Sequence, residues 1–129
     1  MGRRAFAMLM AAGLTLSGCS DSTGPEIFAI SGTWTSVDFP DAQFSMTVVE
    51  TARAVEGAGH RLQDEEAVAF RVYGANAGQR ASLLLDFEEE SDINFEGVFS
   101  RGDANGTLLD GLLFGGGYAG EPITFQRME

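Results

Sequence analysis

The sequence predicts an all-β protein: an eight-stranded antiparallel up-and-down meander that closes into a small barrel after an N-terminal signal segment. Three observations lead to this fold class. From residue 30 onward, short runs of β-forming residues are broken by turn residues, without the sustained 3.6-residue periodicity of an amphipathic helix. Apolar and polar side chains alternate within these runs, and the connections are too short to cross over a sheet. The 129 residues leave room for one small domain.

The first element along the chain is an export signal. Arg3 and Arg4 form a positive start, and the mainly apolar stretch 5–16 follows before a run of small residues. This stretch is shorter than the roughly 17–25 apolar residues that a membrane-spanning helix needs. It is therefore expected to direct export and not to remain as a transmembrane helix.

The signal ends in the motif Leu16-Ser17-Gly18-Cys19, which contains the only cysteine of the chain. The motif resembles the lipobox of bacterial lipoproteins. This resemblance implies a lipoprotein signal peptide over 1–18, cleavage before Cys19, and acyl chains on Cys19 as the membrane anchor. In that family, Asp directly after the lipidated cysteine favours retention in the inner membrane. Here the position is Ser20, so the resemblance favours the outer membrane within the cell envelope.

Residues 19–29 are predicted to form the lipidated cysteine and a flexible tether, because 20–26 is polar and contains Gly and Pro. Once the signal and its two arginines are removed, 19 acidic residues face six basic ones, a formal charge of −13. Such a surface repels anionic headgroups. Membrane contact is therefore expected through the acyl chains on Cys19 and not through the folded face.

The barrel domain is predicted over 30–129, and eight runs within it have strand character. These runs are 32–39, 43–51, 54–62, 67–74, 80–87, 93–101, 106–114 and 121–128. Apolar residues recur at every second position in most of them, so each strand has one core side and one wet side. Because no helix is predicted to cover the apolar side, the sheet is expected to close on itself, which also removes exposed edges.

Glycine recurs inside three predicted strands, always after an apolar residue and an acidic one. Gly57, Gly97 and Gly111 occupy these positions. A glycine within a strand usually indicates a bulge or a sharp bend, and a small barrel needs such bends. We interpret the triplets as features of the architecture and not as a site.

Composition excludes several classes of function. The formal charge of the whole chain is −11 and every basic residue is arginine, so no nucleic-acid partner is expected. One cysteine and one histidine, His60, rule out a zinc site of paired ligands, and no metal or cofactor is expected. The acidic residues fall on turns and outward positions, where they do not form the carboxylate pair of a hydrolase. The sequence therefore predicts a protein that is not an enzyme.

The first predicted strand opens with Gly32-Thr33-Trp34. Together with Val55-Glu56-Gly57-Ala58-Gly59 and a terminal arginine, this motif resembles the calycins, the group of lipocalins, fatty-acid-binding proteins and avidins. The resemblance implies that Arg127 on the last strand lies across Trp34 at the closed end of the barrel. A cation–π contact of that kind contributes about 0.5–2 kcal/mol. Biotin binding is disfavoured, because Trp34 is the only tryptophan and Ser36 stands where avidins have Asn.

A barrel of eight strands is just wide enough to be filled by side chains or to hold one small ligand. Six phenylalanines are the candidates to line such a cavity: Phe44, Phe70, Phe87, Phe95, Phe99 and Phe125. We favour a filled barrel, because about a hundred residues need all the core they can form. The sequence therefore predicts a lipid-anchored envelope lipoprotein with a structural or interaction module, whose partner is an envelope protein. The alternative is a lipocalin-like carrier of a small apolar ligand.

Overall fold

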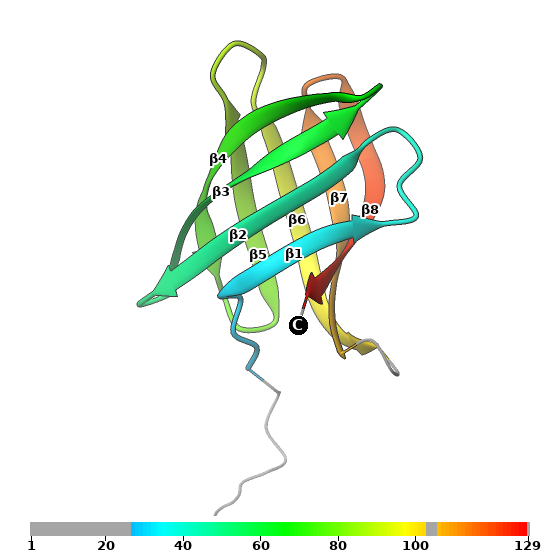
Figure 1. Ribbon diagram of the computed structural model, residues 1–129. Helices are drawn as coiled ribbons and strands as arrows, with labels where there is room; N and C mark the ends of the chain where they lie inside the picture. Colours follow the sequence, from blue (N-terminus) through cyan, green and yellow to red (C-terminus); the bar gives the residue numbers. More distant parts are fainter. Residues whose placement is uncertain (1–26, 103–105, 129) are drawn as a thin grey trace, which may run out of the picture.

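The computed structural model describes residues 27–102 and 106–128, which form eight strands (Figure 1). The strands are β1 (Gly32–Val37), β2 (Gln43–Thr51), β3 (Ala54–Gln63), β4 (Glu66–Asn76), β5 (Arg80–Phe87), β6 (Ile93–Gly102), β7 (Gly106–Gly115) and β8 (Tyr118–Met128). In this part of the chain, no helix is long and apolar enough to cross a membrane. The predicted signal peptide, Cys19 and most of the predicted tether lie outside the described residues.

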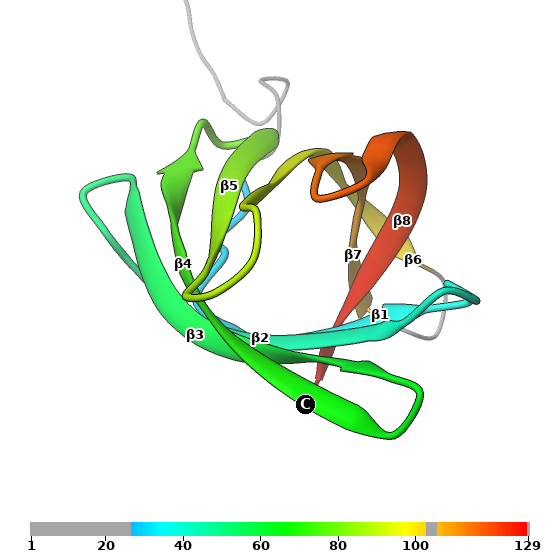
Figure 2. The ribbon, with the colours of Figure 1, turned by 90° about the horizontal axis from the view of Figure 1, so that it is seen from above.

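The strands form a closed barrel. Each strand pairs antiparallel with the next, and β1 also pairs antiparallel with β8, with Trp34 opposite Arg127 (Figure 2). The predicted eight-stranded meander is therefore confirmed. Closure gives each of the eight described strands two partners and leaves none of them as an open edge.

Strand boundaries differ from the predicted runs by two residues or more at three places, and by one residue at four others. β1 ends at Val37 because Asp38 has a φ of 54°, which ends the extended backbone. β4 extends to Asn76, since its last residues continue to pair with β5. β8 begins at Tyr118, because Gly116 and Gly117 turn the chain in two residues with positive φ. The predicted connection over 115–120 is therefore shorter in the structure.

The glycines expected to cause bulges act differently. The β7–β8 ladder has its register shift between Leu113 and Phe114, away from the three triplets. Gly97 and Gly111 lie opposite each other on β6 and β7, and a Cβ on Gly97 would stand 2.4 Å from Cζ of Phe95. These glycines therefore leave room for the Phe95 ring against the barrel wall.

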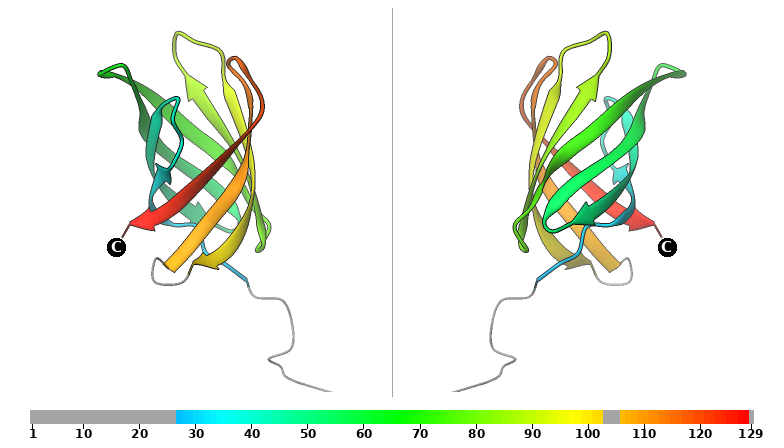
Figure 3. Two further views of the ribbon diagram at one scale, coloured as in Figure 1. Left: turned by 90° about the vertical axis from the view of Figure 1, so that its right-hand side faces the viewer. Right: turned by 90° about the vertical axis from the view of Figure 1, so that its left-hand side faces the viewer.

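The barrel has two different ends (Figures 1 and 3). The chain enters through residues 27–31 at one end, which we call the entry end; β8 also finishes there. The opposite end, which we call the loop end, carries the connections 38–42, 64–65, 88–92 and 116–117. This division follows directly from the meander, because alternate connections lie at alternate ends.

Candidate functional site

Five of the six phenylalanines proposed as cavity-lining residues form one chain of ring contacts through the barrel interior. Phe87 packs on Phe70 at a centroid distance of 5.2 Å, and Phe70 lies 6.3 Å from Phe44. Phe125 continues the chain at 6.5 Å from Phe44 and 5.3 Å from Phe95. All five side chains are buried. The rings contact one another in the barrel interior, and this packing is typical of a filled core.

The sixth residue, Phe99, is separate from this chain of rings. Its ring is stacked on Phe28 at 5.2 Å and tilted against Trp34 at 6.1 Å. Phe28 belongs to the entry segment, so these rings close the entry end of the barrel. Phe99 therefore packs against the N-terminal segment at the entry end, within the same buried core as the other five.

Trp34 and Arg127 are brought together at the entry end. The guanidinium carbon of Arg127 lies 4.7 Å from the Trp34 ring centroid, and Trp34 is fully buried. Arg127 also donates hydrogen bonds to the carbonyls of Ala29 and Ser31. The indole nitrogen of Trp34 donates to the carbonyl of Ile30 at 2.8 Å. Arg127 and Trp34 therefore stack on each other and also hold the backbone of the entry segment through hydrogen bonds.

A polar cluster holds the other side of this segment. The side-chain amide of the buried Asn76 donates to the Phe28 carbonyl and to Glu50 Oε1, both at 2.8 Å. The same Glu50 oxygen accepts from the Ile30 amide at 3.2 Å, and the Phe28 amide donates to the Gly78 carbonyl. The contacts of the entry segment with the barrel thus include Phe28, which precedes the predicted domain boundary at residue 30. We call residues 27–31, which these contacts hold against the barrel, the entry strap. Hydrogen bonds satisfy buried backbone groups of this strap, as buried polar groups require.

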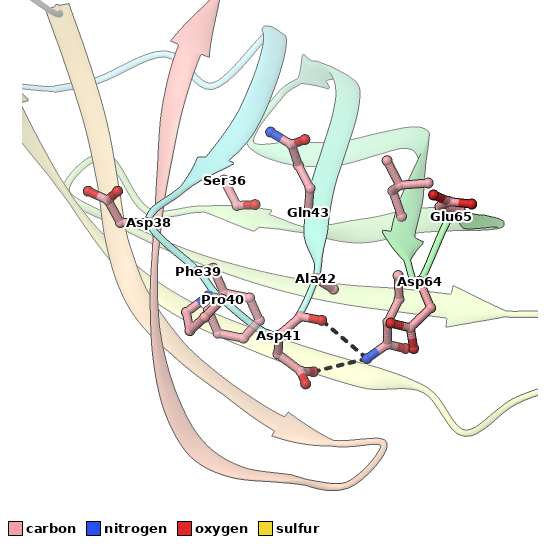
Figure 4. Close-up of a pocket in the computed structure, with 11 residues that line it drawn as sticks. Ser36, Asp38, Phe39, Pro40, Asp41, Ala42, Gln43, Asp64 and Glu65 are labelled. Carbon is pink, nitrogen blue, oxygen red and sulfur yellow. Dashed lines mark hydrogen bonds between the residues drawn. The ribbon is translucent and has the colours of Figure 1, made fainter.

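The loop end is closed by a short aromatic and polar network. The half-buried Phe39 packs on Phe44 and on Tyr118, each at 5.9 Å. The Tyr118 hydroxyl donates to Asp41 Oδ2, and the amide of Gln63 donates to the carbonyl and the carboxylate of Asp41 at 3.3 Å (Figure 4). Burial, together with the hydrogen bond to Asp41, raises the pKa of Tyr118 above its usual value. The β1–β2 loop is therefore held over the mouth.

Arg61 points into the mouth from β3. Its guanidinium carbon lies 4.9 Å from the Phe87 ring centroid, and its Nη2 pairs with Glu90 Oε1 at 2.9 Å. The side chain is 11% exposed, while its Nε is buried without a hydrogen-bond partner. A pocket beside it is lined by Phe39, Tyr118 and Glu121 among others. The inward guanidinium of Arg61 thus lies beside aromatic rings at the mouth.

The loop end is strongly acidic. Among the described residues, ten carboxylate side chains lie on its loops and strand ends: Asp38, Asp41, Asp64, Glu65, Glu66, Glu88, Glu89, Glu90, Asp92 and Glu121. Figure 4 shows several of them around a surface pocket between the β1–β2 loop and the β3–β4 turn. Within residues 27–102 and 106–128, no three His, Cys, Asp or Glu side chains are grouped so that they could hold a metal ion.

Comparison of the chain with family models, curated proteins and solved structures gave no match. The class of protein is therefore defined by the structure itself: a small closed antiparallel β-barrel with an aromatic interior, a strapped entry end and an acidic loop end. Cys19, the predicted lipid-attachment site, lies outside the described residues.

Sequence reasoning missed three residues that close the two ends. Arg61 continues the alternation of β3 and therefore faces inward, a signal that the sequence did contain. Phe39 and Asn76 gave no such signal, because their roles depend on partners far away in the chain, such as Tyr118 and Phe28.

Proposed function

We propose that this protein is a lipid-anchored envelope lipoprotein whose barrel is a non-enzymatic structural or interaction module. The observation that carries the proposal is the chain of phenylalanine rings, which uses the barrel interior for packing. A module without an open lumen contacts partners through its surface. The loop end is then the natural contact surface, since the opposite end holds the entry strap. An envelope protein is the expected partner.

The lipobox-like motif supports the anchor at Cys19, with outer-membrane sorting favoured by Ser20. Two or three acyl chains would anchor the protein stably, because each buried CH₂ contributes about 0.8 kcal/mol and one chain alone is marginal. The calycin-like motif at Trp34 is compatible with the barrel but does not identify a ligand.

Cys19→Ala tests the anchor. The variant is expected to lose incorporation of radiolabelled palmitate and to accumulate as precursor, because the thiol is the proposed attachment point. Ser20→Ala is the matched control and should incorporate palmitate as the wild type does. Palmitate labelling of Cys19→Ala at the wild-type level would reject the anchor.

A carrier of a small apolar ligand is the second candidate. It is favoured by the mouth pocket, where the unpartnered Arg61 Nε lies beside the aromatic rings of Phe39 and Tyr118. A ligand would enter there only if the β1–β2 loop moved and the inner rings repacked. The two candidates differ in whether the wild-type protein binds an apolar fluorescent probe.

A further inference from the structure

The barrel separates its charges. Of the six arginines in the described residues, four lie at the entry end: Arg53 in the β2–β3 turn, Arg80 at the start of β5, Arg101 near the end of β6 and Arg127 near the end of β8. Arg53, Arg80 and Arg101 are exposed. Glu50 lies at the same end; it pairs with Arg53 at 3.7 Å and also accepts hydrogen bonds from Ile30 and Asn76. Two exposed carboxylates lie on the strands beside Arg80: Glu96 is opposite Ser82, and Asp110 is opposite Val98.

Apolar side chains are exposed at the same end. Ile27 is 62% exposed and Met128 is 52% exposed, and they belong to the entry segment and the end of β8. Val98 is 43% exposed and lies directly opposite Arg80 in the β5–β6 ladder. Arginines beside exposed apolar residues are typical of surfaces that lie at the headgroup level of a bilayer.

The number of residues between the proposed anchor and the barrel limits how far the entry end can be from the membrane. Eight residue steps separate Cys19 from Ile27. At about 3.3–3.6 Å per residue, they span at most about 29 Å. We propose that the entry end docks on an anionic lipid surface, with Arg53 and Arg80 against the headgroups and the acidic loop end turned away. The inference rests on the proposed function for the short distance to the membrane.

The overall negative charge does not prevent this contact at ordinary ionic strength. The ends are separated by strands such as β4, of 11 residues, which gives about 20–30 Å along a tilted barrel. The Debye length is about 10 Å at 0.1 M salt, so the loop-end carboxylates are screened from the membrane and the nearby arginines are not. The expectation that the folded face repels lipid assumed an even distribution of charge over the surface. In the structure, the charge is distributed unevenly between the two ends.

Four acidic residues outside the described part also bear on this balance: Asp21, Glu26, Asp103 and Glu129. Because binding is measured on the whole mature chain, the result includes the charges of these four residues.

The experiment uses the mature chain, 19–129, with Cys19→Ser, so that any vesicle binding belongs to the protein and not to acyl chains. Binding is measured at 0.1 M salt to vesicles of phosphatidylcholine alone and of phosphatidylcholine mixed with phosphatidylglycerol.

The expected result is binding to the anionic vesicles only, lost at 1 M salt. Arg80→Glu should weaken it more than about five-fold, since a basic residue near the surface contributes about that factor. Arg71→Glu is the matched control, because Arg71 is exposed in the middle of β4 and changes the net charge equally. It should retain binding within about two-fold.

Equal binding to both vesicle types, no binding to either, or equal losses in the two variants would overturn the proposal. The palmitate experiment reports on the anchor independently. If Cys19 is acylated but these vesicles bind nothing, the anchor stands and the docking fails. If anionic vesicles bind but Cys19 is not acylated, the lipid-facing surface stands without its anchor.

Discussion

Trp34 has three roles at once. Its ring is fully buried between Arg127 and Phe99, and its indole nitrogen holds the Ile30 carbonyl. Each contact alone is modest: a cation–π contact contributes about 0.5–2 kcal/mol and a hydrogen bond about 0.5–1.5 kcal/mol. Together they join the first strand, the last strand and the entry strap. The calycin resemblance pointed to the Trp34–Arg127 pair, whereas the strap contacts depend on backbone positions that no pattern reveals.

Trp34→Ala should lower the free energy of unfolding by about 3–5 kcal/mol, because it empties a buried aromatic site. Arg127→Ala should cost less, since its side chain is only half-buried. Chemical denaturation of both variants measures the difference. An unchanged denaturation midpoint in both would show that the entry end does not depend on this pair.

Tyr118 should make stability fall at alkaline pH. Its pKa is raised in the folded protein, so the unfolded chain releases the phenolic proton first as the pH rises above about 10. The unfolded state then binds fewer protons than the folded state, and stability decreases with pH. Below pH 10 this contribution is fully present.

Denaturation between about pH 8 and 12, on either side of the ordinary phenol pKa of about 10, tests this expectation with Tyr118→Phe as the comparison. The variant should lose part of the alkaline decline, because it has no phenolic proton at this position. Identical slopes above about pH 10 would contradict the raised pKa of Tyr118.

At the scale of the elements, alternation and turn residues located all eight strands, because both signals are local. The ends of the strands were less predictable. The β3–β4 turn has no glycine or asparagine, yet Asp64 and Glu65 take φ values of 52° and 66°. Such left-handed residues cost roughly 1–2 kcal/mol outside glycine, and the pairing of two long strands holds them there. Sequence propensity alone cannot show that a hairpin tolerates this strain.

Glu65→Gly should therefore stabilise the barrel by about 0.5–1 kcal/mol, the gain from removing the strain less the greater entropy of glycine in the unfolded chain. Thermal unfolding measures it. Glu66→Gly is the control, since Glu66 begins β4 in extended backbone and should destabilise. A lower melting temperature for Glu65→Gly would mean that the Glu65 side chain contributes more than its backbone costs.

At the scale of the whole molecule, closure was predictable and the distribution of charge was not. A one-sided apolar sheet without helices must close, whichever residues form it. The separation of charge comes from the meander, which sends 38–42, 64–65, 88–92 and 116–117 to one end and the entry segment to the other. Acidic runs far apart in the sequence thus meet at the loop end. The net charge read from composition hides this asymmetry.

Whether the barrel is a filled module or a carrier depends on how its interior is packed. Substitution of Phe95 tests this packing. Its ring is fully buried, edge-on to Phe125 at 5.3 Å and against the glycines of β6 and β7. In a filled barrel, Phe95→Ala should cost about 3–5 kcal/mol, and the wild type should bind no fluorescent fatty acid. Phe114→Ala is the matched control, because the same residue type is 39% exposed on the outer face of β7 and should cost much less. Saturable probe binding by the wild type, with a small stability loss in Phe95→Ala, would reverse the assignment. In that case part of the Phe95 ring faces space that a ligand uses, and the mouth beside Arg61 is its entrance.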